Sequence, residues 1–379
     1  MKKLMLENCC EILDSMRVPI TAKDRTEGPY PYYGANGIQD YVADYIFDDE
    51  LVLIAEDGGN FGSKTRPIAY RVSGKCWVNN HAHVLKPKAG LDVDFLCYSL
   101  MFYNTDGLVN GATRQKLTQA TMRKMVIPDL PIAEQRDIVD KLNRVVSIRN
   151  LREQELQKLD ELVKARFVEL FGDPVDNPKN YLVKSLQELI DMGYITYHLD
   201  GNHGGDYPRS EEFVDSGIPY IGANSIVNGE VDFAKAKYLT VERAGKLRKG
   251  IAQNEDVLFA HNATVGPVVV LRTAESKVIL STSLTAYRCN KSRLLPNYLK
   301  TYMQSDGFVR QYADEMKQTT RNQVPITAQK KYLFLIPSIV EQEQFAAFVE
   351  QTDKSKLAVQ QSIAELEELK KSLMQKYFG

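Results

Sequence analysis

The stretches ELFGDP (169–174) and QKYFG (375–379) decide how this chain is organised. In each, an aromatic residue followed by glycine ends a long charged segment whose apolar residues recur at intervals of three and four. That spacing predicts an amphipathic helix, and glycine is a common residue just past a helix C-terminus. One chain therefore contains the same helix ending twice, at Phe171 and at Phe378.

The two endings belong to an internal repeat. The positions of Phe171 and Phe378 differ by 207, and the same shift places Glu134-Gln135 on Glu341-Gln342 and Thr113-Arg114 on Thr320-Arg321. Farther back, YGANGI (33–38) resembles IGANSI (221–226), and ELVLIA (50–55) resembles DVLFA (256–260). A repeat of this length is the first feature that a fold prediction has to respect. The predicted order is globular unit, helix, globular unit, helix.

The long helical segments are the clearest local prediction. Each would be a rod of about 38 residues and roughly 57 Å. A helix this long with a single apolar face needs a partner, and the nearest candidate is its own repeat. We expect an antiparallel coiled coil that packs through Leu142, Leu156, Leu159, Val163, Val349, Ile363, Leu366 and Leu373. The alternative is two separate helices, each packed on its own globular unit.

Four parts follow from this pattern: globular units at 1–130 and 174–337, and helices at 131–173 and 338–379. Short β-rich runs alternate with Gly, Asn and Asp turns in both globular units, and a helical stretch follows each set. The predicted fold class is α+β, with two mixed α/β units separated by a long antiparallel two-helix coiled coil and related by an internal pseudo-two-fold repeat. The first unit is shorter than the second, so we do not expect every element to match.

Composition limits the class of protein. The net charge is −1, so any surface that binds a polyanion must be a local patch. No apolar run approaches 18 residues, so we expect no membrane span. The N-terminus lacks the apolar core of a signal peptide. Five cysteines (Cys9, Cys10, Cys76, Cys97 and Cys289) form no CxxC pair, which predicts reduced thiols in a cytoplasmic protein.

Over its whole length the chain resembles the specificity (S) subunits of type I restriction-modification systems. The resemblance rests on the duplication, on TR(Q/N)x(L/V) at 113–117 and 320–324, on the IP…EQ step that opens each long helix, and on the endings LFGDP and YFG. GGNFGS (58–63) followed by WVNNHAHVLKP (77–87) is typical of one target-recognition domain in this family. Each motif alone has low specificity, whereas their order and duplication are specific together.

The resemblance implies a concrete function. Each globular unit would be a target-recognition domain that reads one half of a bipartite double-stranded DNA sequence, and the paired helices would fix the unread gap. Two modification subunits would bind this scaffold and methylate adenine, and restriction subunits, which carry the motor and nuclease, would join them. The S subunit itself would do no chemistry and need no cofactor.

Basic residues are the first candidates for DNA contact, because Lys and Arg bind phosphates. The stretch KAKYLTVERAGKLRKG (235–250) has one acid, Glu242, among its cations. Its candidates are Lys235, Lys237, Arg243, Lys246, Arg248 and Lys249. The alternative for this stretch is an ordinary solvated face. In GGNFGSKTRP (58–67), Lys64 and Arg66 accompany flexible glycines that could bring backbone N–H groups to phosphates, unless the segment is a plain surface hairpin loop.

The repeated TR(Q/N) motif supplies the other candidates, Arg114, Gln115, Arg321 and Asn322. Arginine beside Gln or Asn can read guanine and adenine edges. The shared Thr-Arg step instead favours a phosphate contact or a contact that holds the fold, because units reading different half-sites should differ at their reading residues. Asn36 and Asn224, in the matching GAN turns, are better explained by turn chemistry.

Catalytic motifs are weak by comparison. Asp256 with Glu275 and Lys277 fits the short pattern of a metal nuclease, which also occurs by chance. His81 and His83 would face one side of a predicted strand, but two further zinc ligands are missing nearby. Two alternatives to the DNA-reading scaffold therefore stay open: a stand-alone Mg²⁺-dependent DNA endonuclease and a coiled-coil adaptor without a DNA role.

Overall fold

The computed structural model describes residues 2–111, 115–317 and 323–379. The chain forms two compact units, which we call the first unit (Met1–Glu153 with Gln360–Gly379) and the second unit (Gln154–Val359). Helix α4 (Ile132–Phe171) begins in the first unit and ends in the second, whereas α10 (Ile339–Phe378) begins in the second and ends in the first. Both helices are therefore shared between the units.

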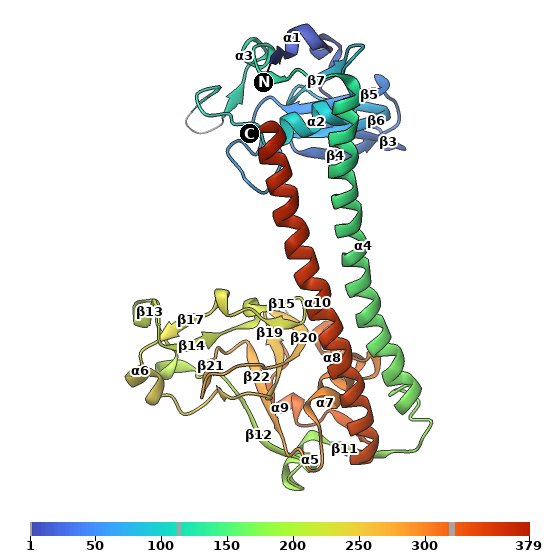
Figure 1. Ribbon diagram of the computed structural model, residues 1–379. Helices are drawn as coiled ribbons and strands as arrows, with labels where there is room; N and C mark the ends of the chain where they lie inside the picture. Colours follow the sequence, from blue (N-terminus) through green and yellow to red (C-terminus); the bar gives the residue numbers. More distant parts are fainter. Residues whose placement is uncertain (1, 112–114, 318–322) are drawn as a thin grey trace. The chain divides into compact units, whose positions relative to one another are not determined.

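A six-stranded sheet forms the centre of the first unit (Figure 1). Its order is β2 (Cys10–Ile12), β7 (Ala82–Pro87), β5 (Phe47–Ala55), β6 (Ala69–Val78), β3 (Tyr30–Gly34) and β4 (Gly37–Val42). Only β3 and β6 pair in parallel, with Tyr32 opposite Trp77. The other neighbours are antiparallel, with Val52 of β5 opposite Leu85 of β7.

The central strand β5 is buried on both of its faces. Successive side chains point to opposite faces of a sheet, so Val52 and Ile54 face one core and Leu51 and Leu53 face another. The first core is covered by helix α2 (Val93–Met101), which packs across β5 and β6 (Figure 1). Asp92 caps this helix by accepting hydrogen bonds from the backbone N–H groups of the first turn.

Short elements complete the first unit. They are the β1 (Lys3–Met5) and β10 (Val126–Pro128) pair, the β8 (Val109–Asn110) and β9 (Lys116–Leu117) pair, helices α1 (Leu6–Cys9) and α3 (Gln119–Arg123), and the 3-10 turn η1 (Asp14–Met16). Because β9 carries the end of the TRQKL motif, that motif is tied to a strand pair.

The second unit repeats this plan. Its four-stranded sheet has the order β12 (Ile195–Asp200), β22 (Leu284–Cys289), β19 (Val257–Asn262) and β20 (Thr264–Val270), which corresponds to β2, β7, β5 and β6. The parallel pair β14 (Ile218–Ile221) and β21 (Val278–Leu280) corresponds to β3 and β6. The long strand β6 of the first unit is thus matched by two strands of the second unit, β20 and β21. The matching order confirms the duplicated α/β unit that the sequence predicts.

Additional elements explain why the second unit is longer. It contains β13 (Phe213–Val214), the hairpin of β15 (Ile226–Val227) and β16 (Glu230–Val231), and helices α6 (Val241–Gly245) and α8 (Asp306–Lys317). These have no counterpart among the described residues of the first unit. The other elements are β11 (Leu182–Ser185), β17 (Lys237–Leu239), β18 (Ile251–Ala252), β23 (Leu333–Ile336), α5 (Leu186–Asp191), α7 (Pro296–Met303), α9 (Ile326–Gln329), η2 (Gly204–Asp206), η3 (Ser210–Glu212), η4 (Ala223–Ser225) and η5 (Phe233–Lys235).

A buried glutamine in the repeated Glu-Gln step performs the same task in both units. The Oε1 atom of Gln135 accepts a hydrogen bond from the N–H of Asp92, and its Nε2 donates to two backbone carbonyls. Gln342 does the same with the N–H of Leu295 and two carbonyls. Each side chain thus fastens the start of a long helix to the residue that precedes α2 or α7. The Glu-Gln step occurs in both halves of the sequence because each long helix needs this buried glutamine at its start.

Each unit contains an antiparallel pair of long-helix segments. In the first, Leu142 near the start of α4 shares a cluster with Leu373 near the end of α10. In the second, Val163 near the end of α4 and Val349 near the start of α10 contribute to one core. The other proposed packing residues, Leu156, Leu159, Ile363 and Leu366, are half-buried. Two ion pairs also join the helices, Arg149 with Glu367 at 3.2 Å and Lys356 with Asp160 at 2.6 Å.

Two general expectations can be compared with the described part of the chain. There, every helix is too short or too polar to cross a membrane. All five cysteines are buried and free. Burial raises the pKa of the Cys97 thiol to about 12, so this thiol has little thiolate and low reactivity.

Candidate nucleic-acid interface

Three sequence motifs of the first unit meet where β5 ends. Asn36, in the turn between β3 and β4, donates from Nδ2 to the carbonyl oxygen of Gly58 at 3.0 Å. The N–H of Gly58 in turn donates to the carbonyl oxygen of Gln115 at 3.2 Å. Gly58 has a φ of +63°, a conformation that glycine adopts without steric cost. The GAN turn, the glycine-rich loop and the TRQKL motif therefore form one surface.

The glycine-rich loop is an ordered turn that exposes two cations. Its Ser63 Oγ accepts hydrogen bonds from the N–H groups of Thr65 at 3.3 Å and Arg66 at 2.9 Å. Asn60 Nδ2 donates to the carbonyl of Pro67 at 3.2 Å and so closes the loop. The side chains of Lys64 and Arg66 are both exposed. Both side chains extend into solvent, where an anionic partner can reach them.

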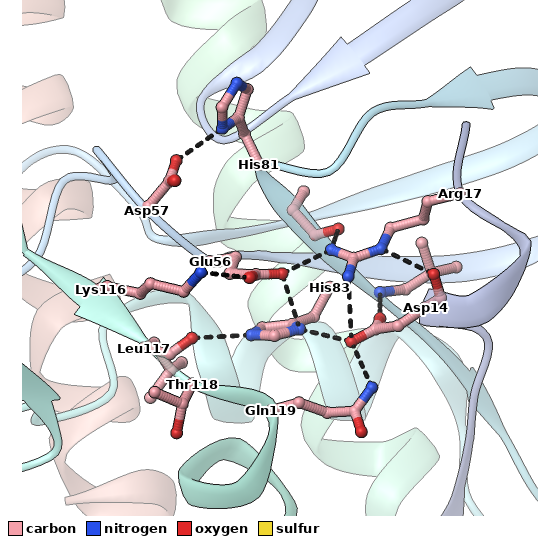
Figure 2. Close-up of polar contacts among 12 residues, drawn as sticks. Asp14, Arg17, Glu56, Asp57, His81, His83, Lys116, Leu117, Thr118 and Gln119 are labelled. Carbon is pink, nitrogen blue, oxygen red and sulfur yellow. Dashed lines mark hydrogen bonds and ion pairs between the residues drawn. The ribbon is translucent and has the colours of Figure 1, made fainter. Parts of the chain in front are cut away.

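Next to this surface lies a completely buried histidine, His83, whose side chain is 0% exposed (Figure 2). Its Nδ1 lies 2.6 Å from Oδ2 of Asp14, and its Nε2 lies 2.9 Å from the carbonyl oxygen of Leu117. The two ring nitrogens therefore both contact oxygen atoms, one of a carboxylate and one of a backbone carbonyl. The ring joins the TRQKL motif, through Leu117, to the interior of the unit.

The carboxylates around His83 have further cationic and polar partners (Figure 2). Nη1 of Arg17 lies 2.7 Å from Oε2 of Glu56, and Nζ of Lys116 lies 2.9 Å from Oε1 of the same carboxylate. Gln119 donates from Nε2 to Oδ2 of Asp14 at 2.8 Å. We call Asp14, Arg17, Glu56, His83, Lys116 and Gln119 the His83 network. It connects η1, β7, β9 and α3 with Glu56, the residue that follows β5.

The pKa values of the two carboxyl groups of the network lie below their ordinary values. Burial would raise the pKa of Asp14, but hydrogen bonds from His83 and Gln119 and the charge of His83 hold it below its ordinary value of 3.8. Burial would likewise raise the pKa of Glu56, but hydrogen bonds from Arg17 and Lys116 and the charges of His83 and Arg17 hold it below 4.5. Both groups are therefore carboxylates near neutral pH.

The donor set of this cluster does not fit a metal ion. Asp14, Glu56 and His83 are close enough together to hold one. However, Arg17 and Lys116 already pair with Glu56, and both ring nitrogens of His83 already contact protein oxygens. A metal would have to displace these contacts in the presence of two fixed cations. The cluster is better described as a structural network of ion pairs.

One prediction about the histidines is wrong. Strand β7 begins at Ala82, so His81 lies in the preceding turn and does not share a strand face with His83. The ring of His81 instead bonds to Asp57, with 2.7 Å between Nδ1 and Oδ1. The predicted strand is interrupted between β6 and β7, because the Asn79 side chain accepts a hydrogen bond from the N–H of His81 and closes a turn.

The second unit holds the equivalent of Leu117 in a related way. The N–H of Val324 donates to the carbonyl of His261 at 2.8 Å, as the N–H of Leu117 donates to the carbonyl of Glu56 at 2.7 Å. Nδ1 of His261 lies 3.0 Å from the carbonyl oxygen of Val324 and so donates to it. Burial lowers the pKa of His261, so this ring is neutral. The two units thus anchor matching residues with different histidines.

The basic stretch of the second unit separates into bound and exposed cations. Arg243 is half-buried and pairs with Glu212 at 2.5 Å, while Lys246 pairs with Glu242 at 2.8 Å on the surface. Lys237 lies 4.7 Å from the centre of the Phe213 ring. The structural partner of Arg243 makes this residue the weakest of the DNA-contact candidates.

Other cations of the stretch are open to solvent. Lys235, Arg248 and Lys249 have exposed side chains. The backbone of Lys249 exchanges two hydrogen bonds with the side chain of Asn202, at 2.7 and 3.2 Å. Asn202 is 3% exposed, so the position of the Arg248-Lys249 step is set by the core of the unit. Cations on a fixed backbone suit phosphate contacts.

Of the remaining DNA-contact candidates from the sequence, the structure describes only one. Gln115 is exposed beside Gly58. Arg114, Arg321 and Asn322 lie outside the described residues. The His83 network was not found from the sequence, because its members are far apart in the chain; Arg17 and Glu56, for example, are 39 positions apart. A histidine between apolar residues of a strand, as in Ala82-His83-Val84, is the signal that indicates a buried ring.

The carboxylate proposed for a nuclease has a structural role. Asp256 is 1% exposed, and its two carboxylate oxygens accept hydrogen bonds from Arg288 at 2.9 and 2.8 Å. One of them also accepts a hydrogen bond from the N–H of Gln253 at 2.9 Å. Glu275, by contrast, is exposed in the loop before β21. The bidentate pairing with Arg288 argues against the endonuclease alternative.

Comparisons with known proteins identify the family. The family model described as type I restriction modification DNA specificity domain matches residues 1–161 and 178–368. A type I restriction enzyme specificity subunit of Haemophilus influenzae is 38% identical over 143 residues, covering 38% of this chain and 37% of the relative. The EcoKI specificity subunit of Escherichia coli is 22% identical over 348 residues, covering 87% of this chain and 74% of the relative.

Solved structures have the same fold. The S subunit of a type I restriction-modification system from M. genitalium matches with a TM-score of 0.55 and 15% identity, covering 100% of this chain and 96% of that chain. A chain from a study of complex assembly and conformational transition in a type I system matches with a TM-score of 0.58 and 18% identity, covering 100% and 97%. At these identities the similarity concerns the fold.

The chain spans only part of the length of several curated relatives that it matches. The chain spans 37% of the Haemophilus influenzae relative and 61% of the EcoBI specificity subunit of Escherichia coli, which is 20% identical over 292 residues. The family match, in contrast, occurs twice and covers most of both units. The chain therefore belongs to the type I restriction-modification specificity subunits.

Proposed function

We propose that this chain reads a bipartite DNA sequence, with one globular unit for each half-site. The observation that carries the proposal is the matched anchoring of Leu117 and Val324, which end the TR(Q/N) motifs of two units with the same strand order. In the second unit the GAN turn also joins this surface, since Ala223 donates to Ser283 Oγ, and the Ser283 carbonyl accepts from His261. Equivalent surfaces on both units suit two similar ligands.

Local cations provide the affinity in this proposal. Because the net charge is −1, nonspecific attraction to DNA has to come from patches. Lys64 and Arg66 are exposed beside the surface of the first unit, and Arg248 and Lys249 are exposed in the second. Such cations position a protein on phosphates without reading bases. Sequence reading falls to groups such as Gln115, whose amide can pair with an adenine edge.

The proposal assigns the chemistry to partner proteins. Two modification subunits bind the chain and methylate adenine, and restriction subunits complete the complex. The long helices act as a spacer between half-sites. DNA rises about 3.4 Å per base pair, so the helix length sets the gap that both units can satisfy together. Support comes from the family membership and from the buried, Arg-paired Asp256, which leaves the nuclease alternative without its central carboxylate.

A genome-wide map of methylated adenine tests the proposal. Cells that carry the partner methyltransferase are compared with and without the gene for this chain. We expect a split sequence motif that is methylated only when the gene is present. If the partner methylates the same positions in both strains, the chain does not direct methylation. Binding of the purified chain to the recovered motif then distinguishes a DNA reader from a coiled-coil adaptor.

A further inference from the structure

We propose that His83 is a positioning residue for DNA recognition: it holds the strand segment Gln115–Leu117 in the orientation that reads one half-site. The inference rests on the proposed function, since it assigns a role within that function. His83 itself is completely buried, so its side chain is not accessible to DNA. It acts through Leu117, whose carbonyl oxygen accepts the hydrogen bond from its Nε2.

Three consecutive residues of the segment are fixed to the unit. The carbonyl of Gln115 accepts from the N–H of Gly58 at 3.2 Å, and the N–H of Leu117 donates to the carbonyl of Glu56 at 2.7 Å. Between them, Nζ of Lys116 pairs with the carboxylate of Glu56 at 2.9 Å. His83 adds a side-chain contact to the carbonyl of Leu117. The backbone of the exposed residue Gln115 is therefore defined from inside the protein.

The position of His83 is in turn set by buried charges. Oδ2 of Asp14 contacts Nδ1 of His83 at 2.6 Å and Nε2 of Gln119 at 2.8 Å, and Oδ1 accepts from the N–H of Val84 at 2.9 Å. Removing one member of a buried ion pair leaves the other without compensation. The segment thus cannot shift without disturbing the core, which keeps its exposed side chains in one arrangement.

The second unit supports the inference independently. Strand pairing places Thr285 of β22 opposite Phe259, as His83 of β7 is opposite Ile54. The second unit therefore has a threonine where the first has its buried histidine. Its anchoring ring, His261, comes from β19 instead and reaches the carbonyl of Val324. Two different strands supply a histidine for the same task, so holding this residue is the shared requirement.

Substitution of His83 separates positioning from general stability. His83→Leu removes both hydrogen bonds, whereas His83→Gln keeps an amide that can donate to the carbonyl of Leu117. Val84→Ala is the matched control, because Val84 is also 0% exposed but faces the opposite core. His261→Leu makes the corresponding change in the second unit. Each full-length chain is measured for its unfolding transition and for binding to the target duplex recovered from the methylation map.

The readout is discrimination against single base changes in each half-site. We expect His83→Leu to lose about tenfold in discrimination at one half-site only, the effect of losing one good base contact. Val84→Ala should leave discrimination unchanged, even when it lowers the stability of the chain as much as His83→Leu does or more. His83→Gln should stay within about threefold of the original chain. His261→Leu should affect the other half-site.

Three results would overturn the inference. Equal losses at both half-sites would show a general effect on folding. A loss in Val84→Ala that matches the loss in His83→Leu would assign the effect to stability. Unchanged discrimination in His83→Leu would remove the positioning role. If that variant does not fold, His83→Thr, which introduces the residue that the second unit has at this position, replaces it in the test, and unchanged discrimination in His83→Thr does the same. An original chain that binds all duplexes alike would instead refute the proposed function.

Discussion

The ring of Phe378 lies 5.3 Å from the ring of Phe95, and the ring of Phe171 lies 4.9 Å from the ring of Tyr298. Phe95 and Tyr298 belong to the corresponding helices α2 and α7. Each long helix thus ends by placing an aromatic side chain against the helix that covers a sheet. The repeated Phe-Gly ending is the completion of a globular core, once in each unit.

Replacing Phe171 with alanine should strongly destabilise the second unit. Phe171 is 1% exposed and also packs against Phe345 at 5.6 Å. Loss of a buried phenylalanine typically costs about 3–5 kcal/mol of unfolding free energy. Hydrogen exchange of the α7 amides, which reports opening of this unit, measures the change. Val168→Ala on the same helix is the control, because Val168 is 51% exposed, and an equal effect from it would contradict the account.

The glutamine contacts lead to a second stability prediction. Gln342 is 0% exposed, so Gln342→Ala leaves the N–H of Leu295 and two backbone carbonyls without their partner. Leaving buried polar groups unsatisfied costs about 1–3 kcal/mol. Urea denaturation should show this loss. Gln344→Ala, at an exposed position of the same helix turn, should change stability little. Comparable losses in the two variants would mean that the buried hydrogen bonds are unimportant.

Acid should weaken the first unit through Asp14 and Glu56. Their pKa values in the folded protein lie below the ordinary 3.8 and 4.5, so the unfolded chain binds more protons in the interval between. The stabilisation is complete above the ordinary values and is lost as the pH falls through the folded ones. The free energy of unfolding, measured as a function of pH, should therefore decrease as the pH falls below these ordinary values.

A matched pair of variants tests whether Asp14 causes this loss of stability in acid. Asp14→Asn should be less stable at neutral pH but show a shallower loss on acidification, because one titrating group of the His83 network is gone. Glu7→Gln removes an exposed carboxylate and should keep the original slope. If Asp14→Asn follows the original curve, the acid sensitivity of the unit arises elsewhere.

The basic stretch gives a prediction about salt dependence. Changing Lys246, Arg248 and Lys249 together to glutamine should weaken DNA binding and lower the slope of log K against log salt by about 2 to 3, since each lost phosphate contact removes about 0.9. Binding titrations at several salt concentrations measure the slope. The charge-matched control changes the exposed helix residues Lys158, Lys164 and Lys354. An identical response of the two triple variants would exclude a specific role for the stretch.

Local patterns account for what the sequence predicted correctly. The long helices follow from a 3.6-residue period, and the duplication follows from motifs such as Glu134-Gln135 and Glu341-Gln342, both of which are visible without tertiary contacts. The strand prediction at His81 failed because the side chain of Asn79 forms a turn there.

Long-range pairing accounts for what the sequence did not reveal. Arg243 looked like a free cation, but Glu212, which lies 31 residues earlier, neutralises it. The His83 network was missed for the same reason, since Asp14 and Gln119 are 105 residues apart. Buried ion pairs of this kind leave no periodic trace in a sequence.

Exchange of residues 174–337 for the same segment of another family member, followed by adenine methylation mapping, tests the central claim most directly. The account predicts that one half of the split motif changes to the donor's sequence while the other half and its spacing to the first are retained. The original chain and the reciprocal exchange of residues 1–130 serve as controls, and the latter should change the other half. A motif that changes in both halves, or in neither, would contradict the claim that each unit reads one half-site.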